Sequence, residues 1–400
     1  MFSKVFDAAI RRLSESVKSR LMEDRKMEIV ALEKLVDDRF EQFKRELEAL
    51  RVATESSDSA VLRTVFDSTK RTIPGGQPNT NPLAEMLRDI ASLRWNVKLF
   101  GAKLANELYE KGLAGERAQI PREPIRIDLK SKLCVQADIE SEWLRHWCGQ
   151  LRLTPIYSRK IWEYGFVLQA IWEAGYLQPG CSGLAFAVGN EPTPAYLASR
   201  GVSVLATDLS GNDERSQGWQ ETGQHSESLD GLFRPDLLER SLFDKLCSFR
   251  PVDMNDIPTD LYGKFDFCWS MCSFEHVGSI EQGLEFVRNS VRCLKPGGVA
   301  AHTTEFSFEK SDETIDNWPC VLFQPKHVAE LERRLNADGH ELLSVSYDPG
   351  TQDLDMFIDG PPYPWQPRQS MQLPNSPIMR INVDGFPATS IGLIIRARRS

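Results

Sequence analysis

The sequence lacks the long apolar runs and the paired cysteines that mark several classes of protein. No stretch approaches the roughly 20 consecutive apolar residues of a spanning helix, and the first residues lack the apolar centre of a secretory signal. The eight cysteines are scattered, without a C-x-x-C pair or zinc-like spacing, and the six histidines form no visible metal triad. We therefore expect a cytoplasmic, metal-independent protein whose cysteines are reduced and mostly buried.

Positive charge is also in short supply. The chain holds 57 acidic and 48 basic residues, which gives a net charge of −9 and argues against a nucleic-acid partner. Its 400 residues, of which 41% are hydrophobic, suit a soluble protein of two or three globular units. No internal repeat occurs at a fixed period.

The first 51 residues contain neither proline nor glycine, and nearly half of them are charged. We predict a long helix over residues 1–52. Its apolar side chains form a narrow seam at steps of three or four residues: Ile29, Leu32, Val36, Phe40, Phe43, Leu47 and Leu50. A coiled coil that makes a homo-oligomer and a helix packed on the body both fit that seam. The first turns are amphipathic and basic, so contact with an anionic membrane surface is a third possibility.

A linker and a helical region follow. Residues 53–82 are rich in Ser, Thr, Pro, Gly and Asn, which is typical of a linker with at most a short helix. A helical pattern runs from residue 83 to about 112, and two more helices are predicted over 139–151 and 158–176. Both carry tryptophans at helical spacing, which favours core packing. We assign 83–154 to a helical region and 155–400 to a separate domain.

From Gly183 onward short apolar runs alternate with helical segments, which is typical of a parallel sheet with helices on both faces. The predicted strands are GLAFAVG, VSVLATD, FDFCWSM and GVAAHTTEF, and their continuous apolar character suits strands buried on both sides. Two more candidates, ELLSVSYD and TSIGLIIRARR, flank a proline-rich excursion over about 350–390. The predicted fold class is α/β with an open, mostly parallel sheet.

Ligands of such sheets bind beyond the carboxyl ends of the strands. The first strand breaks into GLAFAVGNEPTP, where Gly189 permits close approach of a ligand and Ala187 and Glu191 hold the flanking turn positions. Thr193 is a candidate cap for the next helix, whose free amides can hold an anion. The second strand ends in Asp208, whose side chain can accept both ribose hydroxyls. Dinucleotide binders and methyltransferases share this pairing.

The block from RPVDMNDIP to LKPGG resembles the second half of class I S-adenosylmethionine-dependent methyltransferases. In that superfamily an acidic residue near a strand end abuts the adenine, which Asp253 with Met254 matches. The next strand ends beside the methionine part, which WSMCSFEHV, with Ser270, matches. Ser279 and Gln282 form a capping box for the following helix, which we expect to end at Gly297. The resemblance implies a Rossmann-like methyltransferase sheet with a terminal antiparallel strand, and S-adenosyl-L-methionine as cofactor.

A closer likeness lies in the runs ADIESEWLRHWCG, GWQETGQHSESL and IDGPPY. They resemble a group of bacterial methyltransferases that often accompany glycosyltransferases in surface-polysaccharide biosynthesis. The likeness implies an acceptor oxygen on a glycan or glycan precursor. One feature departs from the superfamily: Ala185 fills the place of the usual acidic residue in the first strand, so Glu191 is our candidate for holding the methionine amino group.

Methyl transfer to a hydroxyl benefits from a general base. His276 in SFEHV is the first candidate, because histidine as a residue type titrates near neutral pH, and Glu305 in HTTEF is the second. A hydrogen bond from His276 to the backbone is the structural alternative. His302 is expected in packing, and Arg159 is a candidate to close over the cofactor. The remaining candidates, for the acceptor, are His225 and two residues of the excursion, which we expect to form a lid: Asp359 and Tyr363.

Two other functions stay open at this point. A nicotinamide-dependent oxidoreductase is favoured by Gly189 and Asp208 taken alone. A methyltransferase-like scaffold without catalysis, acting through the N-terminal helix, is favoured by the altered glycine turn.

Overall fold

The computed structural model describes residues 72–73, 77–78, 81–113, 119–309, 313–316, 319–360 and 376–399. The helix predicted over 1–52, with its coiled-coil and membrane alternatives, lies outside these residues, as does most of the linker. The chain divides into two compact units, Met1–Trp95 and Asn96–Ser400. In the described part of the chain, no helix has both the length and the apolar character needed to span a membrane.

The first unit contains a short hairpin and the start of a long helix. Strands β1 (Thr72–Ile73) and β2 (Gln77–Pro78) pair antiparallel. Helix α4 (Asn81–Leu108) begins in this unit, continues into the second, and is followed by the π-helical turn η1 (Tyr109–Leu113). The helical pattern predicted over 83–112 is therefore confirmed.

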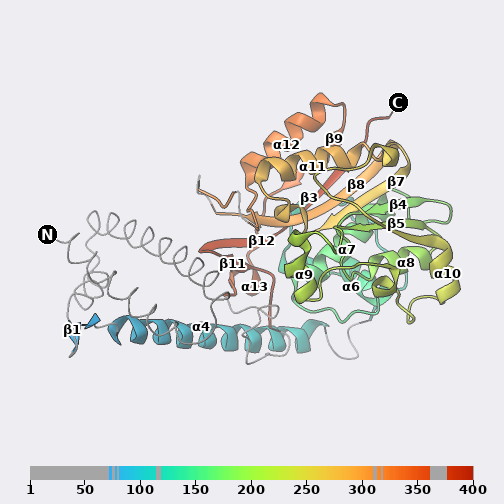
Figure 1. Cartoon of the computed structure of the whole chain (residues 1–400). Helices are drawn as coiled ribbons and strands as arrows, with labels where there is room; N and C mark the ends of the chain where they lie inside the picture. Colours follow the sequence, from blue (N-terminus) through green and yellow to red (C-terminus); the bar gives the residue numbers. More distant parts are fainter. Residues whose placement is uncertain are drawn as a thin grey trace. The chain divides into compact units, whose positions relative to one another are not determined.

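The second unit is built on a mostly parallel sheet with the strand order β10-β3-β12-β8-β7-β4-β5-β6 (Figure 1). Strands β4 to β8 pair in parallel, and β12 runs antiparallel to β8. The strands are β3 (Ser131–Leu133), β4 (Ser182–Ala185), β5 (Ser203–Asp208), β6 (Cys247–Pro251), β7 (Phe265–Met271), β8 (Leu294–Ser307), β9 (Glu341–Leu342), β10 (Val345–Ser346), β11 (Ile381–Val383) and β12 (Phe386–Arg396). The predicted α/β class with a terminal antiparallel strand is confirmed.

Helices cover both faces of the sheet (Figure 1). One face carries α6 (Glu142–Gln150), α7 (Arg159–Glu173), α8 (Thr193–Ser199) and α10 (Arg240–Leu246), and the other carries α11 (Ile280–Val291) and α12 (Pro325–Ala337). Each face has its own apolar cluster, one around Phe166 and the other around Phe286. This three-layer arrangement leaves the carboxyl ends of the parallel strands for ligands. The remaining short elements are α5 (Gln136–Ile139), η2 (Glu214–Ser216), α9 (Gln217–Glu221), η3 (Leu229–Leu232), η4 (Thr259–Leu261), η5 (Phe274–His276) and α13 (Asp353–Met356).

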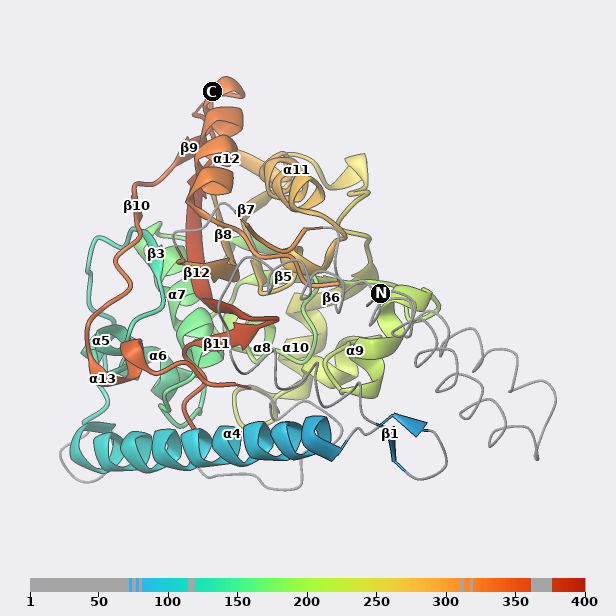
Figure 2. The same cartoon turned by 90° about the vertical axis from the view of Figure 1, so that its left-hand side faces the viewer.

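The core does not follow the domain boundary predicted between residues 154 and 155. Trp147 on α6 and Trp162 on α7 are both buried in one apolar cluster. The short strand β3, which no sequence pattern predicted, lies between β10 and β12, and Figure 2 shows the three side by side. The described residues between Asn96 and position 154 therefore belong to the same body as the sheet, and the packing role predicted for the tryptophans is confirmed.

Two predicted helix ends are wrong. Helix α8 begins at Thr193 behind Pro192, so Thr193 is not its cap, and its Oγ1 has no hydrogen-bond partner among the described residues. Helix α11 starts at the predicted cap, where the Ser279 hydroxyl accepts from the Gln282 backbone N–H at 3.2 Å. It ends at Val291 rather than Gly297, because β8 already begins at Leu294.

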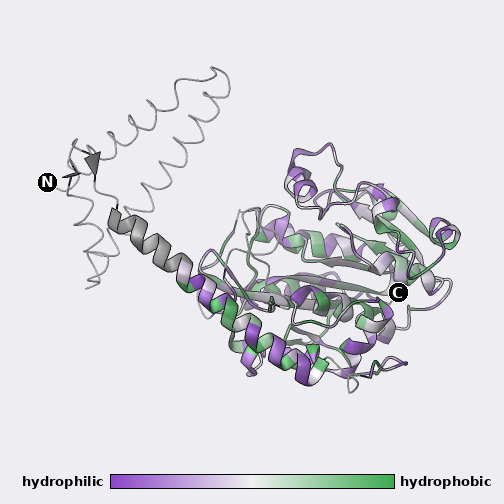
Figure 3. Ribbon diagram, turned by 90° about the horizontal axis from the view of Figure 1, so that it is seen from below, coloured by the Kyte–Doolittle hydropathy of each residue, from purple (hydrophilic) through white to green (hydrophobic). Residues whose placement is uncertain are grey.

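The part of α4 after Trp95 alternates hydrophilic and hydrophobic residues along its length (Figure 3). Ala102 and Ala105 are buried, whereas Val97 and Phe100 are exposed. The buried Lys98 donates to both carboxylate oxygens of Asp359, at 2.9 and 3.0 Å. This segment of α4 is thus held by a buried ion pair as well as by apolar contacts.

Candidate functional site

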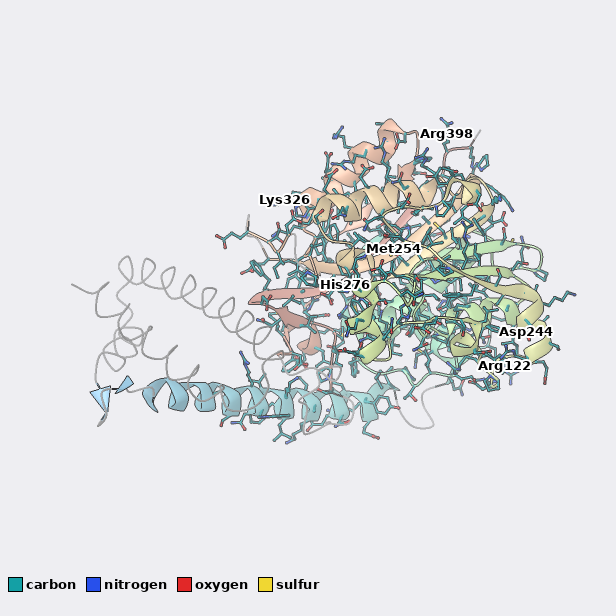
Figure 4. All side chains as sticks on the ribbon, in the orientation of Figure 1. Arg122, Asp244, Met254, His276, Lys326 and Arg398 are labelled. Atoms are coloured by element: carbon teal, nitrogen blue, oxygen red, sulfur yellow. The ribbon has the colours of Figure 1, made fainter. Side chains whose placement is uncertain are left out.

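A cavity of about 330 Å³ opens where β4, β5 and β7 end. Met254 and His276, both labelled in Figure 4, belong to its wall. The wall is formed by residues at or after the ends of β4, β5, β6 and β7, together with two from α7 and several from the segment between η2 and His225: Lys160, Tyr164, Ala187, Val188, Gly189, Asn190, Glu191, Asp208, Leu209, Arg215, Trp219, Gly223, Gln224, His225, Val252, Asp253, Met254, Asn255, Met271, Cys272, Ser273, His276 and Val277. The cavity thus lies at the edge of the sheet where the sequence placed the chemistry.

The turn after β4 is held in an uncommon backbone conformation. Ala187 has φ +47° and Gly189 has φ +51°, both in the left-handed region. A Cβ on Gly189 would lie only 2.6 Å from the carbonyl oxygen of Gln224. Position 189 therefore requires glycine for space as well as for conformation, whereas position 187 accepts alanine at a conformational cost of about 1 kcal/mol.

This difference between the two turn positions predicts opposite outcomes for two small substitutions. We expect Ala187→Gly to change the free energy of unfolding by no more than about 1 kcal/mol, because the relieved φ strain offsets the added chain entropy. We expect Gly189→Ala to cost about 2 kcal/mol and to weaken cofactor binding, because its Cβ meets backbone. Urea unfolding and calorimetry measure both, and equal losses in the two variants would contradict this account of the turn.

Asp208 ties three backbone segments together at the end of β5. Its Oδ2 accepts from the N–H groups of Gly189 at 3.0 Å and Ser226 at 3.2 Å, and its Oδ1 accepts from Leu209 N–H at 2.8 Å. Burial raises the pKa of Asp208 above its ordinary value, and these N–H groups partly offset the rise. The carboxylate thus fixes the glycine turn in addition to facing the cavity, a role that the sequence did not reveal.

Glu191 supplies a buried acid from the same turn. Its Oε2 accepts from the Trp269 indole N–H at 3.4 Å. Burial raises the pKa of Glu191 to about 8, although the nearby charge of Lys160 acts in the opposite direction. A buried carboxyl group with a raised pKa favours the binding of a ligand whose positive charge lies beside it.

The opposite side of the cavity is closed by side chains of η2 and α9. Arg215 on η2 pairs with Asp253 at 2.7 Å and with Asp213 at 2.6 Å. Trp219 on α9 lies against His276, with ring centroids 4.5 Å apart. Sequence reasoning missed both residues, although the run GWQETGQHSESL had pointed to this segment. Asp253 and Met254 follow β6 and line the cavity beside them.

His276 on η5 presents one ring nitrogen to the backbone. Its Nδ1 lies 2.7 Å from the carbonyl oxygen of Pro319. Because a carbonyl oxygen only accepts, Nδ1 is the donor in this contact, and in the neutral ring Nε2 is then the nitrogen with a lone pair. The backbone hydrogen bond expected as the structural alternative is therefore present, in a residue that also lines the cavity.

His225 contacts the backbone through the other ring nitrogen, Nε2. Its Nε2 lies 2.8 Å from the carbonyl oxygen of Leu209, so Nε2 is the donor. Its Nδ1 is buried and has no hydrogen-bond partner among the described residues. The residue lines the cavity beside Asp208, with Nε2 3.9 Å from the Asp208 carboxylate, while Nδ1 itself is shielded from the cavity.

Two of the predicted site residues on the sheet lie outside the cavity wall. Ser270 is fully buried and its hydroxyl lies 2.8 Å from Nδ1 of His302, which is also buried, as expected. Glu305 pairs with Arg159 and accepts from the Cys320 thiol at 2.9 Å. Burial alone would raise the pKa of Glu305, but the Arg159 charge holds it below its ordinary value. Glu305 is thus half of a buried ion pair and is not a residue of the cavity wall, and the same ion pair occupies Arg159.

The proline-rich excursion contributes no wall residue from its described parts, residues 350–360 and 376–390. Asp359, predicted to contact the acceptor, is buried against Lys98 instead. Tyr363 lies outside the described residues. Within the part of the chain that the structure describes, no group of three or more His, Cys, Asp or Glu side chains can hold a metal ion.

The cavity's donors and acceptors fit S-adenosyl-L-methionine. Gly189 leaves room for a close ligand, and the Asp208 carboxylate can accept from ribose hydroxyls. Glu191 offers a buried acid for an amino group, and Asp253 with Met254 offers a polar and an apolar contact for a base. Each end of a nucleoside-linked amino acid thus meets suitable chemistry.

Comparison with known proteins gives one family match. Residues 184–302 match the model of a methyltransferase domain, which is less than a third of the chain. No curated protein matches the sequence. The match begins within β4 and ends within β8, and it includes every residue of the cavity wall except Lys160 and Tyr164.

Several solved structures are similar. A proposed sarcosine dimethylglycine methyltransferase from Galdieria sulphuraria is 15% identical and has a TM-score of 0.35, covering 60% of this chain and 88% of its own. A methyltransferase from Methanosarcina mazei is 12% identical with a TM-score of 0.34, covering 57% and 98%. Phosphoethanolamine N-methyltransferase 2 from Haemonchus contortus, in complex with S-adenosyl-L-methionine, is 18% identical with a TM-score of 0.31, covering 44% and 37%.

The matched domain and the chemistry of its cavity agree on the class of protein. The chain is an enzyme with a methyltransferase domain, and its cofactor is S-adenosyl-L-methionine. This result removes the basis for the oxidoreductase alternative, which rested on Gly189 and Asp208 alone.

Proposed function

We propose that this S-adenosylmethionine-dependent methyltransferase acts on an oxygen of a glycan or glycan precursor, with His276 as general base. The supporting observation is that His276 lines the cavity while its Nδ1 contacts the Pro319 carbonyl oxygen, which leaves Nε2 of the neutral ring as the acceptor nitrogen. When bound, the cofactor supplies an electrophilic methyl group. The protein's part is to hold the acceptor in line with that group and to accept the hydroxyl proton.

The proposed division of the wall follows the order of the strands. Ala187, Gly189 and Glu191 hold the methionine part, while Asp208 and His225 face the ribose. On the far side, Asp253 with Met254 holds the base. These contacts are proposed from the positions and the chemistry of the residues, and each can be tested by substituting the residue concerned.

Two features support a carbohydrate acceptor. Trp219 places an aromatic ring beside His276, and aromatic rings are suitable surfaces for the apolar face of a sugar. The sequence runs ADIESEWLRHWCG and GWQETGQHSESL resemble methyltransferases that accompany glycosyltransferases. An oxygen acceptor also explains the value of a base, because a hydroxyl must lose its proton as the new bond forms.

The test is a direct one. The full-length protein is incubated with S-adenosylmethionine carrying an isotope-labelled methyl group and with nucleotide sugars and short oligosaccharides, and amines and thiols serve as the comparison set. Mass spectrometry is expected to find the label on a hydroxyl oxygen. Label found only on nitrogen or sulfur would overturn the oxygen acceptor. Calorimetry with S-adenosylhomocysteine and with NAD is expected to show binding of the first alone.

The apolar seam of residues 29–50 supports a second proposal, that the N-terminal helix makes the protein a homo-oligomer. We expect Phe43→Asp with Leu47→Asp to lower the mass of the full-length protein in light scattering, because a charge in the seam is costly to bury. Arg45→Asp, off the seam, is the matched control. A mass that is the same in all three proteins would contradict the proposal.

A further inference from the structure

The methionine end of the cavity contains a basic residue from outside the matched domain. We infer that Lys160 of α7 holds the carboxylate of the cofactor's amino-acid end while Glu191 holds its ammonium group, so that the pair recognises a zwitterion. This inference rests on the cofactor and not on the identity of the acceptor. It assigns a binding role to α7, a helix that the sequence linked to packing and to Arg159.

Lys160 is placed and oriented by its neighbours. It lies in the first turn of α7 and lines the cavity together with Glu191. Its Nζ pairs with Glu163 Oε2 at 2.7 Å and donates to the Met271 carbonyl oxygen at 3.3 Å. An ammonium group has three N–H donors, so one donor remains beyond these two contacts.

The charges around Lys160 leave its ammonium group able to bind an anionic ligand. Glu163 is fully buried, and burial alone would raise its pKa, yet Lys160 and Arg159 hold the pKa below its ordinary value. Glu305 is likewise ionised against Arg159. Arg159 and Lys160 therefore balance Glu163 and Glu305 in charge, and a zwitterionic ligand itself brings no net charge to these four side chains.

Glu191 is the acidic member of the proposed pair with Lys160. It faces Lys160 and Glu163 from α7, Asp208 from β5 and the Trp269 indole from β7. Ala185 of β4, which fills the place of the acidic residue usual in the superfamily, has no charge. It pairs with Trp269 in the β4–β7 register. Glu191 is therefore the acid of this turn, and a ligand ammonium stabilises its ionised form.

The experiment compares two ligands that differ by one group. S-adenosylhomocysteine carries the carboxylate, and S-adenosyl-3-thiopropylamine lacks it. In calorimetry with the full-length protein, we expect Lys160→Met to weaken binding of the first about tenfold or more and to change binding of the second by less than about threefold. Lys160→Arg is expected to restore most of the loss. Lys264→Met, just before the amino end of β7 and away from the cavity, is the control.

The outcomes separate this inference from the cofactor assignment. Equal weakening of both ligands by Lys160→Met would show that Lys160 only maintains the fold, and would overturn the inference. Wild-type protein that binds neither ligand would instead contradict the assignment of S-adenosylmethionine. Thermal unfolding of each variant confirms that the comparison is made on folded protein.

A second readout follows the proton on Glu191. At pH 7 we expect binding of S-adenosylhomocysteine to release close to one proton, because a carboxyl group with a pKa of about 8 loses its proton to meet the ligand's ammonium. Calorimetry in two buffers of different ionisation enthalpy measures the release. Glu191→Gln is expected to abolish it, and a release that persists in that variant would refute the assignment of Glu191.

Discussion

Replacement of Asp208 by alanine is expected to abolish measurable binding of S-adenosylhomocysteine and to lower the free energy of unfolding by about 3 kcal/mol. The carboxylate accepts from Gly189, Ser226 and Leu209, and its loss leaves three backbone N–H groups without this acceptor. The glycine turn then loses the contact that fixes it beside the cavity. The variant therefore removes the proposed contact of Asp208 with the ligand. It also removes the hydrogen bond that holds the glycine turn, which is proposed to make a second ligand contact.

A graded series separates these two effects. Asp208→Asn keeps one acceptor oxygen but turns an amide donor toward backbone N–H groups, so we expect it to lose stability and affinity to an intermediate degree. Asp236→Ala, at an exposed aspartate paired with Arg234, is expected to change neither. Calorimetry and urea unfolding give the two quantities. Wild-type affinity in Asp208→Ala would refute the cofactor role of this residue.

The sequence predicted the strands that surround the cavity because their apolar runs are continuous and end in turn residues. GLAFAVG, VSVLATD and FDFCWSM all became neighbouring parallel strands, which brought Gly189, Asp208 and His276 into one wall. Strand β3 escaped prediction because three residues give no period. The β11–β12 hairpin carried a signal that was overlooked: Asp384 and Gly385 both have positive φ, as a two-residue Asp-Gly turn requires.

Residues within the predicted strands were harder to place, since successive side chains point to opposite faces of a sheet. Ser270 points into the helical layer beside His302, while Met271 and Cys272 reach the cavity. The ion pair of Asp359 with Lys98 could not be predicted from local sequence patterns, because the two residues lie 261 positions apart in the sequence. Lys160 was missed for a related reason: only the packing of α7 on the sheet brings its first turn to the strand ends.

The role of His276 gives the second large effect. We expect His276→Ala to lower kcat by about 10² to 10⁴ for a hydroxyl acceptor, because the variant has no group to accept the proton. Binding of S-adenosylhomocysteine is expected to change by less than about threefold, because the proposed cofactor contacts lie on other residues. The measurement combines single-turnover methyl transfer with calorimetry.

His225 is the matched control, since it is the other histidine in the same wall but faces the backbone through Nε2 rather than Nδ1. Its ring lies beside Asp208, with Nε2 3.9 Å from that carboxylate, so His225→Ala is expected to weaken cofactor binding while single-turnover chemistry at saturating cofactor is largely retained. His276→Gln keeps a hydrogen-bonding side chain without a comparable base and is expected to behave as His276→Ala does. Unchanged turnover in both His276 variants would reject its role as base, and a loss of cofactor affinity there would place the residue in the binding site instead.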